Sequence, residues 1–331
     1  MLEHLWSILP VLILILTAEF VNGWTDAPNA IATVVSTRVL SPHQAVFMAT
    51  CFNILGAMSG TAVAATIGTG IIDMAIINPT TVAAAMVGII VWSTFAYYAG
   101  GIPTSESHAL VAGLAGAGLA TAGPSVIVWA GWRKVLIGLF FSTFLGFLGG
   151  LGIMVLLYRF FYRSRPGFIR GLFGRLQILS AAFMAFSHGS NDGQKFIGVF
   201  SLALVLGGLL PEFQVPLWVI LLCATTMGIG TAVGGWRIIR TMGIRLTKLE
   251  PIHGFSAETS AAVVLDLASR LGIPLSTTHT LGTSIMGVGS IRRFSAVRWG
   301  LAGEIIMAWV LTFPICGLIA YLVTLLINFL T

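Results

Sequence analysis

Charged residues are scarce in this sequence: Asp, Glu, Lys and Arg make up 8% of its 331 residues, whereas a soluble domain carries about 25%. Hydrophobic residues make up 57%, and the mean hydropathy is +0.97. Apolar windows recur along the chain, and a helix needs about 20 apolar residues to cross a bilayer. This composition excludes a soluble globular domain and predicts an all-α polytopic membrane protein in contact with membrane lipid.

Cysteine is scarce too, and the three cysteines show no spacing typical of a metal site. We therefore expect packing residues, with no zinc site, no disulfide framework and no cofactor. The net charge of +6 comes from basic clusters: Arg159, Arg163, Arg165, Arg170 and Arg175; Arg237, Arg240, Arg245 and Lys248; and Arg292, Arg293 and Arg298. The positive-inside rule predicts that these clusters are cytoplasmic and that residues 66–78 lie outside. Without an accompanying soluble domain, we expect no nucleic-acid partner.

Two polar motifs occur twice, in the same order, within apolar sequence. The first, Gly23-Trp-Thr-Asp26-Ala-Pro-Asn29, has a looser counterpart in Gly189-Ser-Asn-Asp192-Gly-Gln-Lys195. The second, Gly101-Ile-Pro-Thr-Ser105-Glu-Ser-His108, returns as Gly272-Ile-Pro-Leu-Ser276-Thr-Thr-His279. Ordered motifs at nearly equal offsets indicate an internal repeat, and in a membrane protein this is typical of a transporter with duplicated halves.

The motifs also predict how each half is built. Residues 1–158 form a first transmembrane repeat, residues 159–175 a basic cytoplasmic linker, and residues 176–331 a second repeat. In each repeat we expect a span broken at the first motif, a whole span (near residues 45–67 and 217–236), a re-entrant hairpin whose tip is the second motif, and a final span. Three net crossings in each half require inverted topology. Irregular backbone at membrane depth is tolerated only where it is buried or lines a cavity.

The repeated aspartates, Asp26 and Asp192, are the strongest candidates for a cation site. Ionisable groups at membrane depth cost about 2.5–3.5 kcal/mol on insertion scales, so they are functional candidates by default. Two carboxylates facing each other at the midplane suit Na⁺ or a shared proton. The alternative is that both carboxylates accept hydrogen bonds from the amides of the broken helices.

The hairpin tips predict an anion site instead. Each tip supplies hydroxyl groups just before a helix, and a helix N-terminus offers free N–H groups and a positive dipole. Ser and Thr also favour such places simply as N-caps, which is the alternative interpretation. Arg270, just before the second tip, could bind an anion or could pair with Asp266 one turn earlier. Lys195 replaces Asn29 in the second copy, where its ammonium could substitute for a bound cation or contact substrate.

These motifs resemble the signatures of the inorganic phosphate transporter family. The first signature resembles Asn22-Gly-Trp-Thr-Asp26-Ala-Pro-Asn29 and the residues up to Arg38. The second, in its prokaryotic form, resembles Ser187-His-Gly-Ser-Asn-Asp192-Gly-Gln-Lys195. The tips resemble the family's paired hairpin sequences, and Glu258 in Gly254-Phe-Ser-Ala-Glu258 matches an acidic family position. The resemblance covers essentially the whole chain, although Pro28 and Glu106 depart from the pattern and leave the substrate preference open.

The resemblance implies symport of inorganic phosphate with Na⁺ or H⁺, by alternating access, across the cytoplasmic membrane of a prokaryote. The expected phosphate-binding residues are Asn29, Thr104, Ser105, Ser107, Lys195, Arg270, Ser276, Thr277 and Thr278. The expected cation-binding residues are Asp26, Asn29, Asn191, Asp192 and Glu258, with Asp26 and Asp192 as the metal ligands if the ion is Na⁺. A homodimer is a possible assembly.

Other functions stay open at this point. Sulfate or another tetrahedral oxyanion would use similar geometry. An intramembrane metal-dependent hydrolase could be built from His188, Asp192 and Asp26, but no close ligand spacing such as HExxH supports it. Paired intramembrane carboxylates argue against a passive anion channel. We therefore expect a transporter and no enzyme.

Overall fold

The computed structural model describes residues 2–26, 28–291 and 293–330, and an all-α membrane protein is what it shows. Within these residues the only β feature is an isolated bridge between Ile72 and Ile127. The elements of the first half are α1 (Leu2–Thr25), α2 (Pro28–Ser36), α3 (Pro42–Ala57), α4 (Ala62–Gly70), α5 (Pro79–Gly100), α6 (Glu106–Ala122), η1 (Gly123–Val126) and α7 (Trp129–Phe161). The elements of the second half are α8 (Pro166–His188), η2 (Gly189–Gly193), α9 (Gln194–Leu206), α10 (Leu217–Val233), α11 (Trp236–Arg240), η3 (Thr241–Arg245), α12 (Pro251–Arg270), α13 (Thr277–Ser290), η4 (Phe294–Ala296) and α14 (Trp299–Leu330).

The membrane spans differ from the predicted ones in one respect. Among the described residues, six helical segments are long and apolar enough to cross a bilayer, or up to eight if two bent pairs count as spans. The expected whole spans are these bent pairs: α3 and α4 meet at 67°, and α10 meets the α11–η3 segment at 62°. Gly234, with φ of +72°, permits the second bend because only glycine adopts this backbone region readily.

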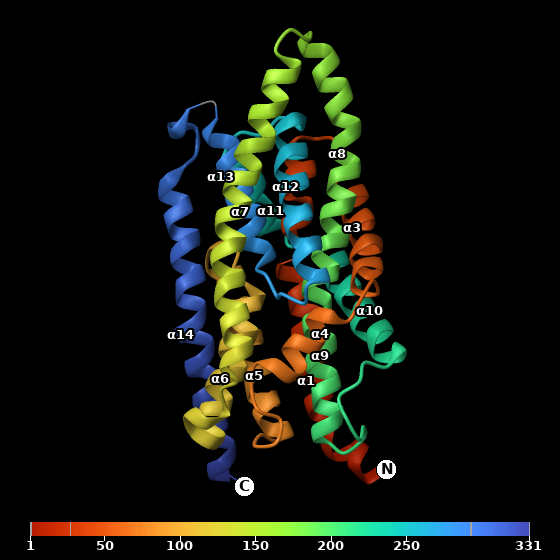
Figure 1. The fold of residues 1–331 in the computed structure, drawn as a ribbon, viewed down its shortest axis with the longest axis vertical. Helices are drawn as coiled ribbons and strands as arrows, with labels where there is room; N and C mark the ends of the chain where they lie inside the picture. The colour runs from red at the N-terminus through yellow and green to blue at the C-terminus, as the bar shows by residue number, and fades with distance from the viewer. Residues whose placement is uncertain (1, 27, 292, 331) are drawn as a thin grey trace.

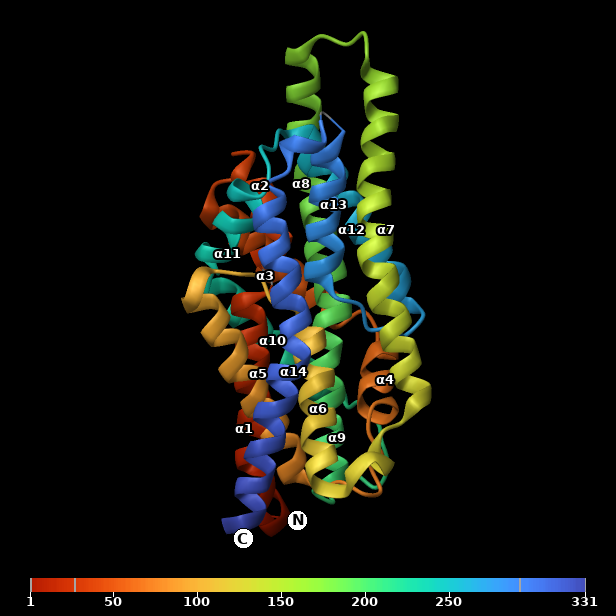
Figure 2. The ribbon, with the colours of Figure 1, turned by 90° about the vertical axis from the view of Figure 1, so that its left-hand side faces the viewer.

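A helical hairpin lies at each predicted place, and its re-entrant course in the membrane stays a prediction, since both arms of the first hairpin are long and apolar enough to cross a bilayer. α5 and α6 form the first, and α12 and α13 form the second. Gly101 and Gly272 begin the two tips with φ of +61° and +66°, which explains the glycine that opens each motif. Figures 1 and 2 show α5 and α6 toward the end of the molecule that carries the chain termini, and α12 and α13 toward the opposite end. The tips therefore approach each other from opposite directions.

The two copies of the first motif interrupt their helices with different backbone conformations. α1 ends at Thr25 and α2 begins at Pro28, with residue 27 outside the described part of the chain. In the second copy the chain stays helical, and residues Gly189–Gly193 form a single π-helical turn between α8 and α9. A π-turn leaves local backbone groups out of the regular ladder and is frequent at functional sites.

Helices of one half pack against helices of the other. α1 crosses α10, and α8 crosses α3. Both crossings are so close that they require glycine. A Cβ at Gly23 would lie 2.2 Å from the carbonyl oxygen of Met227, and a Cβ at Gly189 would lie 2.1 Å from that of Asn53. The final helices are exchanged too, since α14 packs on α5 and α6, and α7 packs on α12 and α13.

Two apolar clusters, rather than one, form the core. One cluster contains Ile15, Leu110 and Phe200, and the other contains Ile31, Phe173 and Leu281. Along α1–α2 and along α8–α9, buried polar residues separate the two clusters. The polar motifs thus occupy a layer between two hydrophobic cores, each of which draws on both halves.

The predicted basic linker is mostly helical, because α7 runs to Phe161 and α8 begins at Pro166. The turn between them lies at the end of the molecule opposite both termini (Figure 1). Of the third basic cluster, Arg292 lies outside the described residues. The boundaries of the halves, their inverted orientation and the cytoplasmic side stay predictions.

Candidate functional site

The two repeated aspartates meet in the buried polar layer. Asp26 follows the end of α1, and Asp192 lies in the π-helical turn. Asp26, Asp192 and His188 each offer a ligand atom, and these atoms all lie within 4.8 Å of one another. The Thr277 hydroxyl is 2.9 Å from Asp192 Oδ2 and 3.3 Å from Asp26 Oδ2. Two carboxylates this close and shielded from water repel each other unless a cation or a proton lies between them.

On the first-half side, oxygen atoms gather around Asp26. Thr278 Oγ1 donates to Asp26 Oδ1 and is 3.0 Å from the carbonyl oxygen of Thr104. Asn29 Nδ2 donates to Asp26 Oδ1 and to Thr278 Oγ1. Asn29 Oδ1 is buried and has no hydrogen-bond partner among the described residues. A buried acceptor without a partner suggests a missing ligand, and oxygen atoms of these kinds are what a hard cation prefers.

On the second-half side, the ammonium of Lys195 holds the matching position. Lys195 Nζ forms an ion pair with Asp192 and donates to Ser107 Oγ. It also donates to the carbonyl oxygen of Leu275 at 2.8 Å. An ammonium has three N–H donors, so all three are used within the protein and none is left for an anion in this conformation.

The tip serines face each other across the layer. Ser105 Oγ donates to Ser276 Oγ at 2.8 Å. Each serine also N-caps its helix, accepting from the amide of His108 at 3.3 Å and of His279 at 3.2 Å respectively. The structural role given as an alternative is therefore real, and the N-termini of α6 and α13 converge where the serines meet.

Asn191 and Arg270, two of the residues expected in the site, have other contacts. Asn191 Oδ1 accepts from the amide of Leu275 at 3.1 Å, and its Nδ2 donates to Ser269 Oγ at 3.0 Å. Asn191 thereby fixes the second tip and does not turn its amide toward the aspartates. Arg270 is 73% exposed and pairs with Asp266 at 2.8 Å, which is the alternative to anion binding.

Glu258 lies in a separate polar cluster. Its carboxylate accepts from Thr33, Ser180 and Gln177, which come from α2 and α8. Sequence reasoning selected the acid but missed all three donors. A signal was present, because Gln177 and Ser180 are polar residues three apart in an apolar helix, and Thr33 lies one turn after Asn29.

Glu106 is a further buried acid that received no role. It occupies the place in the first tip that Thr277 holds in the second. Thr25 Oγ1 donates to Glu106 Oε1 at 3.1 Å, while Oε2 has no partner among the described residues. His188 contacts Asn53 through Nδ1 at 3.1 Å.

Comparison with known proteins agrees with the family resemblance of the motifs. Residues 22–171 and 166–320 match the family model described as the Phosphate transporter family. The chain belongs to the phosphate transporter family. A probable low-affinity inorganic phosphate transporter of Rhizobium meliloti is 47% identical over 306 residues, which cover 92% of this chain and 91% of that protein.

Two further similarities support the family assignment. A probable low-affinity inorganic phosphate transporter of Bacillus subtilis is 38% identical over 324 residues, which cover 96% of this chain and 97% of that protein. A solved structure described as the sodium-dependent phosphate transporter has a TM-score of 0.89 and 23% identity, and the match covers 98% of this chain and 99% of that one. The family resemblance in the motifs and the all-α polytopic fold are thereby confirmed.

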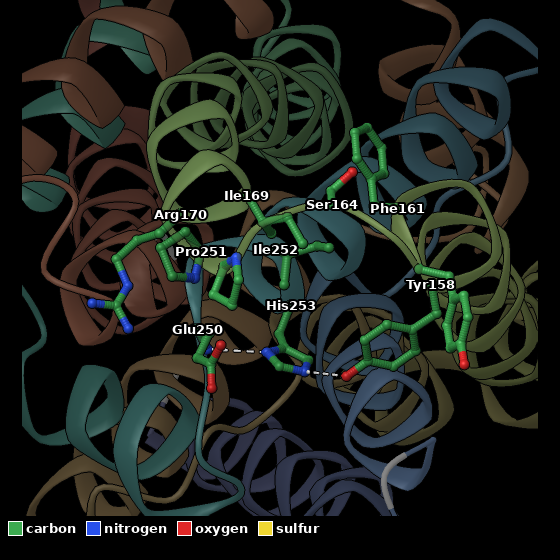
Figure 3. A pocket seen from close by; sticks show the side chains of 11 residues that line it. Tyr158, Phe161, Ser164, Ile169, Arg170, Glu250, Pro251, Ile252 and His253 are labelled. Carbon is green, nitrogen blue, oxygen red and sulfur yellow. Dashed lines mark hydrogen bonds between the residues drawn. The ribbon is translucent and has the colours of Figure 1, made fainter.

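This member of the phosphate transporter family also has a surface pocket outside the polar layer. A cavity of about 340 Å³ lies where the α7–α8 turn approaches the start of α12 (Figure 3). Its lining includes Tyr158 and Arg170, and His253 Nε2 is 3.3 Å from the Tyr158 hydroxyl. None of the predicted site residues lines this pocket.

Proposed function

We propose that this protein is a secondary active transporter that moves inorganic phosphate together with Na⁺ or H⁺ across the cytoplasmic membrane of a prokaryote. The observation that carries the proposal is the convergence of Asp26, Asp192 and the two hairpin tips in one buried layer. The names of the curated relatives support phosphate as the substrate and transport rather than an enzymatic reaction.

The tips supply the phosphate site in this proposal. The N-termini of α6 and α13 present amide groups and positive dipoles to the same place, and such ends bind oxyanions well. The hydroxyl groups of Ser105 and Ser276 contact each other, so phosphate enters by separating them and accepting a hydrogen bond from each. Ser107, Thr277 and Thr278 lie one to two residues further into the same helix starts.

The coupling cation binds beside Asp26. Asp26, Asn29, Thr278 and the carbonyl of Thr104 form a compact set of oxygen atoms, which suits Na⁺, and the carboxylate alone suits H⁺. Glu258, with its own hydroxyl partners, is a second, separate cation position. Cations loaded beside HPO₄²⁻ offset a charge that would otherwise oppose passage through the membrane.

The test is uptake of labelled phosphate into liposomes that contain the purified protein. We expect accumulation when a Na⁺ or an H⁺ gradient is imposed, and little accumulation without one. An excess of unlabelled phosphate should compete and an equal excess of sulfate should not. Uptake that is indifferent to both gradients, or that sulfate abolishes as well as phosphate does, would disprove the proposal.

A further inference from the structure

The ammonium of Lys195 lies in a cradle of oxygen atoms within the buried polar layer. The side chain is 1% exposed, among the largest fully buried side chains of the described residues. Its Nζ contacts a carboxylate oxygen of Asp192, the hydroxyl oxygen of Ser107 and the carbonyl oxygen of Leu275. These are the kinds of atom that surround a bound metal cation in proteins.

The same cradle exists around Asp26, without an ammonium. Asp26 and Asp192 hold matching places in the first motif, as do Asn29 and Lys195. By the spacing of the second motif, Thr278 corresponds to Ser107 and Thr104 to Leu275. Each contact of Lys195 therefore has its counterpart in an oxygen beside Asp26.

The set around Asp26 is a carboxylate oxygen of Asp26 and the carbonyl of Thr104 from the first half, with the hydroxyl of Thr278 from the second tip. Where Lys195 stands in the second half, the first half has Asn29, whose Oδ1 is buried without a partner among the described residues. The cradle around Asp192 is occupied by the chain's own ammonium, Lys195. The cradle around Asp26 has no such charge, and the Asn29 Oδ1 acceptor beside it has no partner among the described residues.

We propose that Lys195 is a tethered cation that permanently fills the second half's cation position, so that of the two cradles only the one around Asp26 takes a mobile coupling cation. This inference rests on the proposed function and specifies its stoichiometry. A lysine moves with the protein and returns with it in every cycle, so it neutralises Asp192 without being delivered. The protein then carries one coupling cation fewer per phosphate than a symmetrical pair of cradles would.

The experiment compares the parent with Lys195→Asn and Asn29→Lys in liposomes. The driving cation is first identified with the parent by imposed Na⁺ and H⁺ gradients, and the charge moved per phosphate is then measured under voltage clamp with valinomycin and K⁺. We expect Lys195→Asn to move one additional positive charge per phosphate and to depend more steeply on the driving cation. Asn29→Lys should lose its dependence on that cation. Lys134→Asn is the matched control, because Lys134 is exposed on α7, and it should behave as the parent.

For variants that insert into the membrane but do not transport phosphate, cation binding is measured instead. Thermal unfolding in detergent is followed in NaCl and in choline chloride at equal ionic strength. Lys195→Asn should gain stabilisation by Na⁺ relative to the parent, and Asn29→Lys should lose it. If Lys195→Asn does not insert, Asn29→Lys decides, since retention of the parent's cation dependence would overturn the inference.

The two hypotheses fail in different ways. A parent without cation-driven phosphate uptake contradicts the proposed function itself. A parent with coupled uptake, together with a Lys195→Asn variant of unchanged charge per phosphate and unchanged Na⁺ stabilisation, contradicts only the tethered cation.

Discussion

The aspartate of each half is surrounded by the same kinds of oxygen atom, but the two halves complete the set with different side chains. Beside Asp26 stands an amide, Asn29, and beside Asp192 stands an ammonium, Lys195. Both halves contain the hairpin, the tip serine and a glycine at a close helix crossing, but only the second half contains the ammonium. Repetition of a backbone device therefore does not imply two equal ion sites.

A second difference between the halves shifts the charge in the same direction. In the first tip Glu106 adds an acid, whereas Thr277 in the second tip bridges both aspartates through one hydroxyl. Among the residues whose burial is described, the first half thus has one more buried acid, and the second half has a buried lysine where the first half has none. The asymmetry places the positive charge on the π-helical side of the layer.

The largest expected effects are those of replacing the two aspartates, and the two variants should differ in stability. Asp26→Asn and Asp192→Asn should each abolish accumulation of phosphate, because each removes a buried negative charge that balances a cation. Their stabilities should differ: Asp192→Asn leaves the Lys195 ammonium unpaired, a loss of about 3–5 kcal/mol for a broken buried pair, whereas Asp26→Asn leaves no buried base alone. Thermal unfolding in detergent and liposome uptake measure the two effects.

The control for this prediction is the double variant Asp192→Asn/Lys195→Met, which removes both charges. It should recover most of the stability and none of the coupled uptake. Equal stability of the two single variants would show that Lys195 does not depend on Asp192.

The next effect tests whether the helix crossings are equivalent. Gly23→Ala and Gly189→Ala each force a methyl group onto a backbone oxygen of the facing helix. Overpacking of this kind costs about 1–3 kcal/mol or more, and the two losses should be similar. Gly152→Ala in α7 is the matched control, since a Cβ there meets nothing within 4 Å. It should be neutral or stabilising by up to about 1 kcal/mol.

Stability against heat in detergent, with retained expression, is the measurement for the glycine variants. A large loss in Gly189→Ala alone would mean that the π-helical turn, and not the crossing, is the sensitive feature.

A smaller effect is expected at the hairpin tips. Ser105→Ala and Ser276→Ala each remove one hydroxyl donor to a charged oxygen, a loss of about 1.5–3 kcal/mol. This corresponds to a roughly ten- to hundredfold weaker apparent affinity for phosphate. The two effects should be alike, the double variant close to inactive, and affinity for the cation less changed. Concentration dependence of uptake gives both affinities.

Thr80→Ala is the control for the serines, because Thr80 is exposed and its hydroxyl donates to Asn78, away from both tips. If both serine variants keep the parent's affinity for phosphate, the serines serve as N-caps alone and the anion is held elsewhere.

The smallest effect is expected at Arg270, whose place in the first half is taken by Ala99. Its exposed pair with Asp266 should contribute about 0–1 kcal/mol to stability. Arg270→Ala should leave the affinity for phosphate nearly unchanged in the same uptake assay. A tenfold loss of affinity for phosphate would show that Arg270 contributes to the substrate site.

Local features of this fold were readable from the sequence. The hairpin tips follow from Gly-Ile-Pro between apolar arms, and the interruption after α1 follows from Gly23 and Pro28, since Pro28 opens α2. The approach of Asp26 to Asp192 follows from the repeat. The difference between Asn29 and Lys195 was visible as a substitution, although only the contacts of Nζ show what it does.

Features that depend on tertiary packing were not readable. The bends within α3–α4 and α10–η3 lie in sequence apolar enough to suggest straight spans. The partners of Glu258 come from helices far apart in the chain, and no local pattern pairs α1 with α10. Asn191 was expected in the cation site, yet its amide group contacts Leu275 and Ser269 at the second tip instead.

The exchange of helices between the halves has a consequence for how the protein is made. When residue 158 has left the ribosome, α1 still lacks α10, and the first hairpin still lacks α14. Both apolar clusters contain residues from the second half, so neither core can close early in synthesis. The buried acids of the first half must therefore stay in the membrane, or beside an insertion partner, until helices of the second half arrive to enclose them.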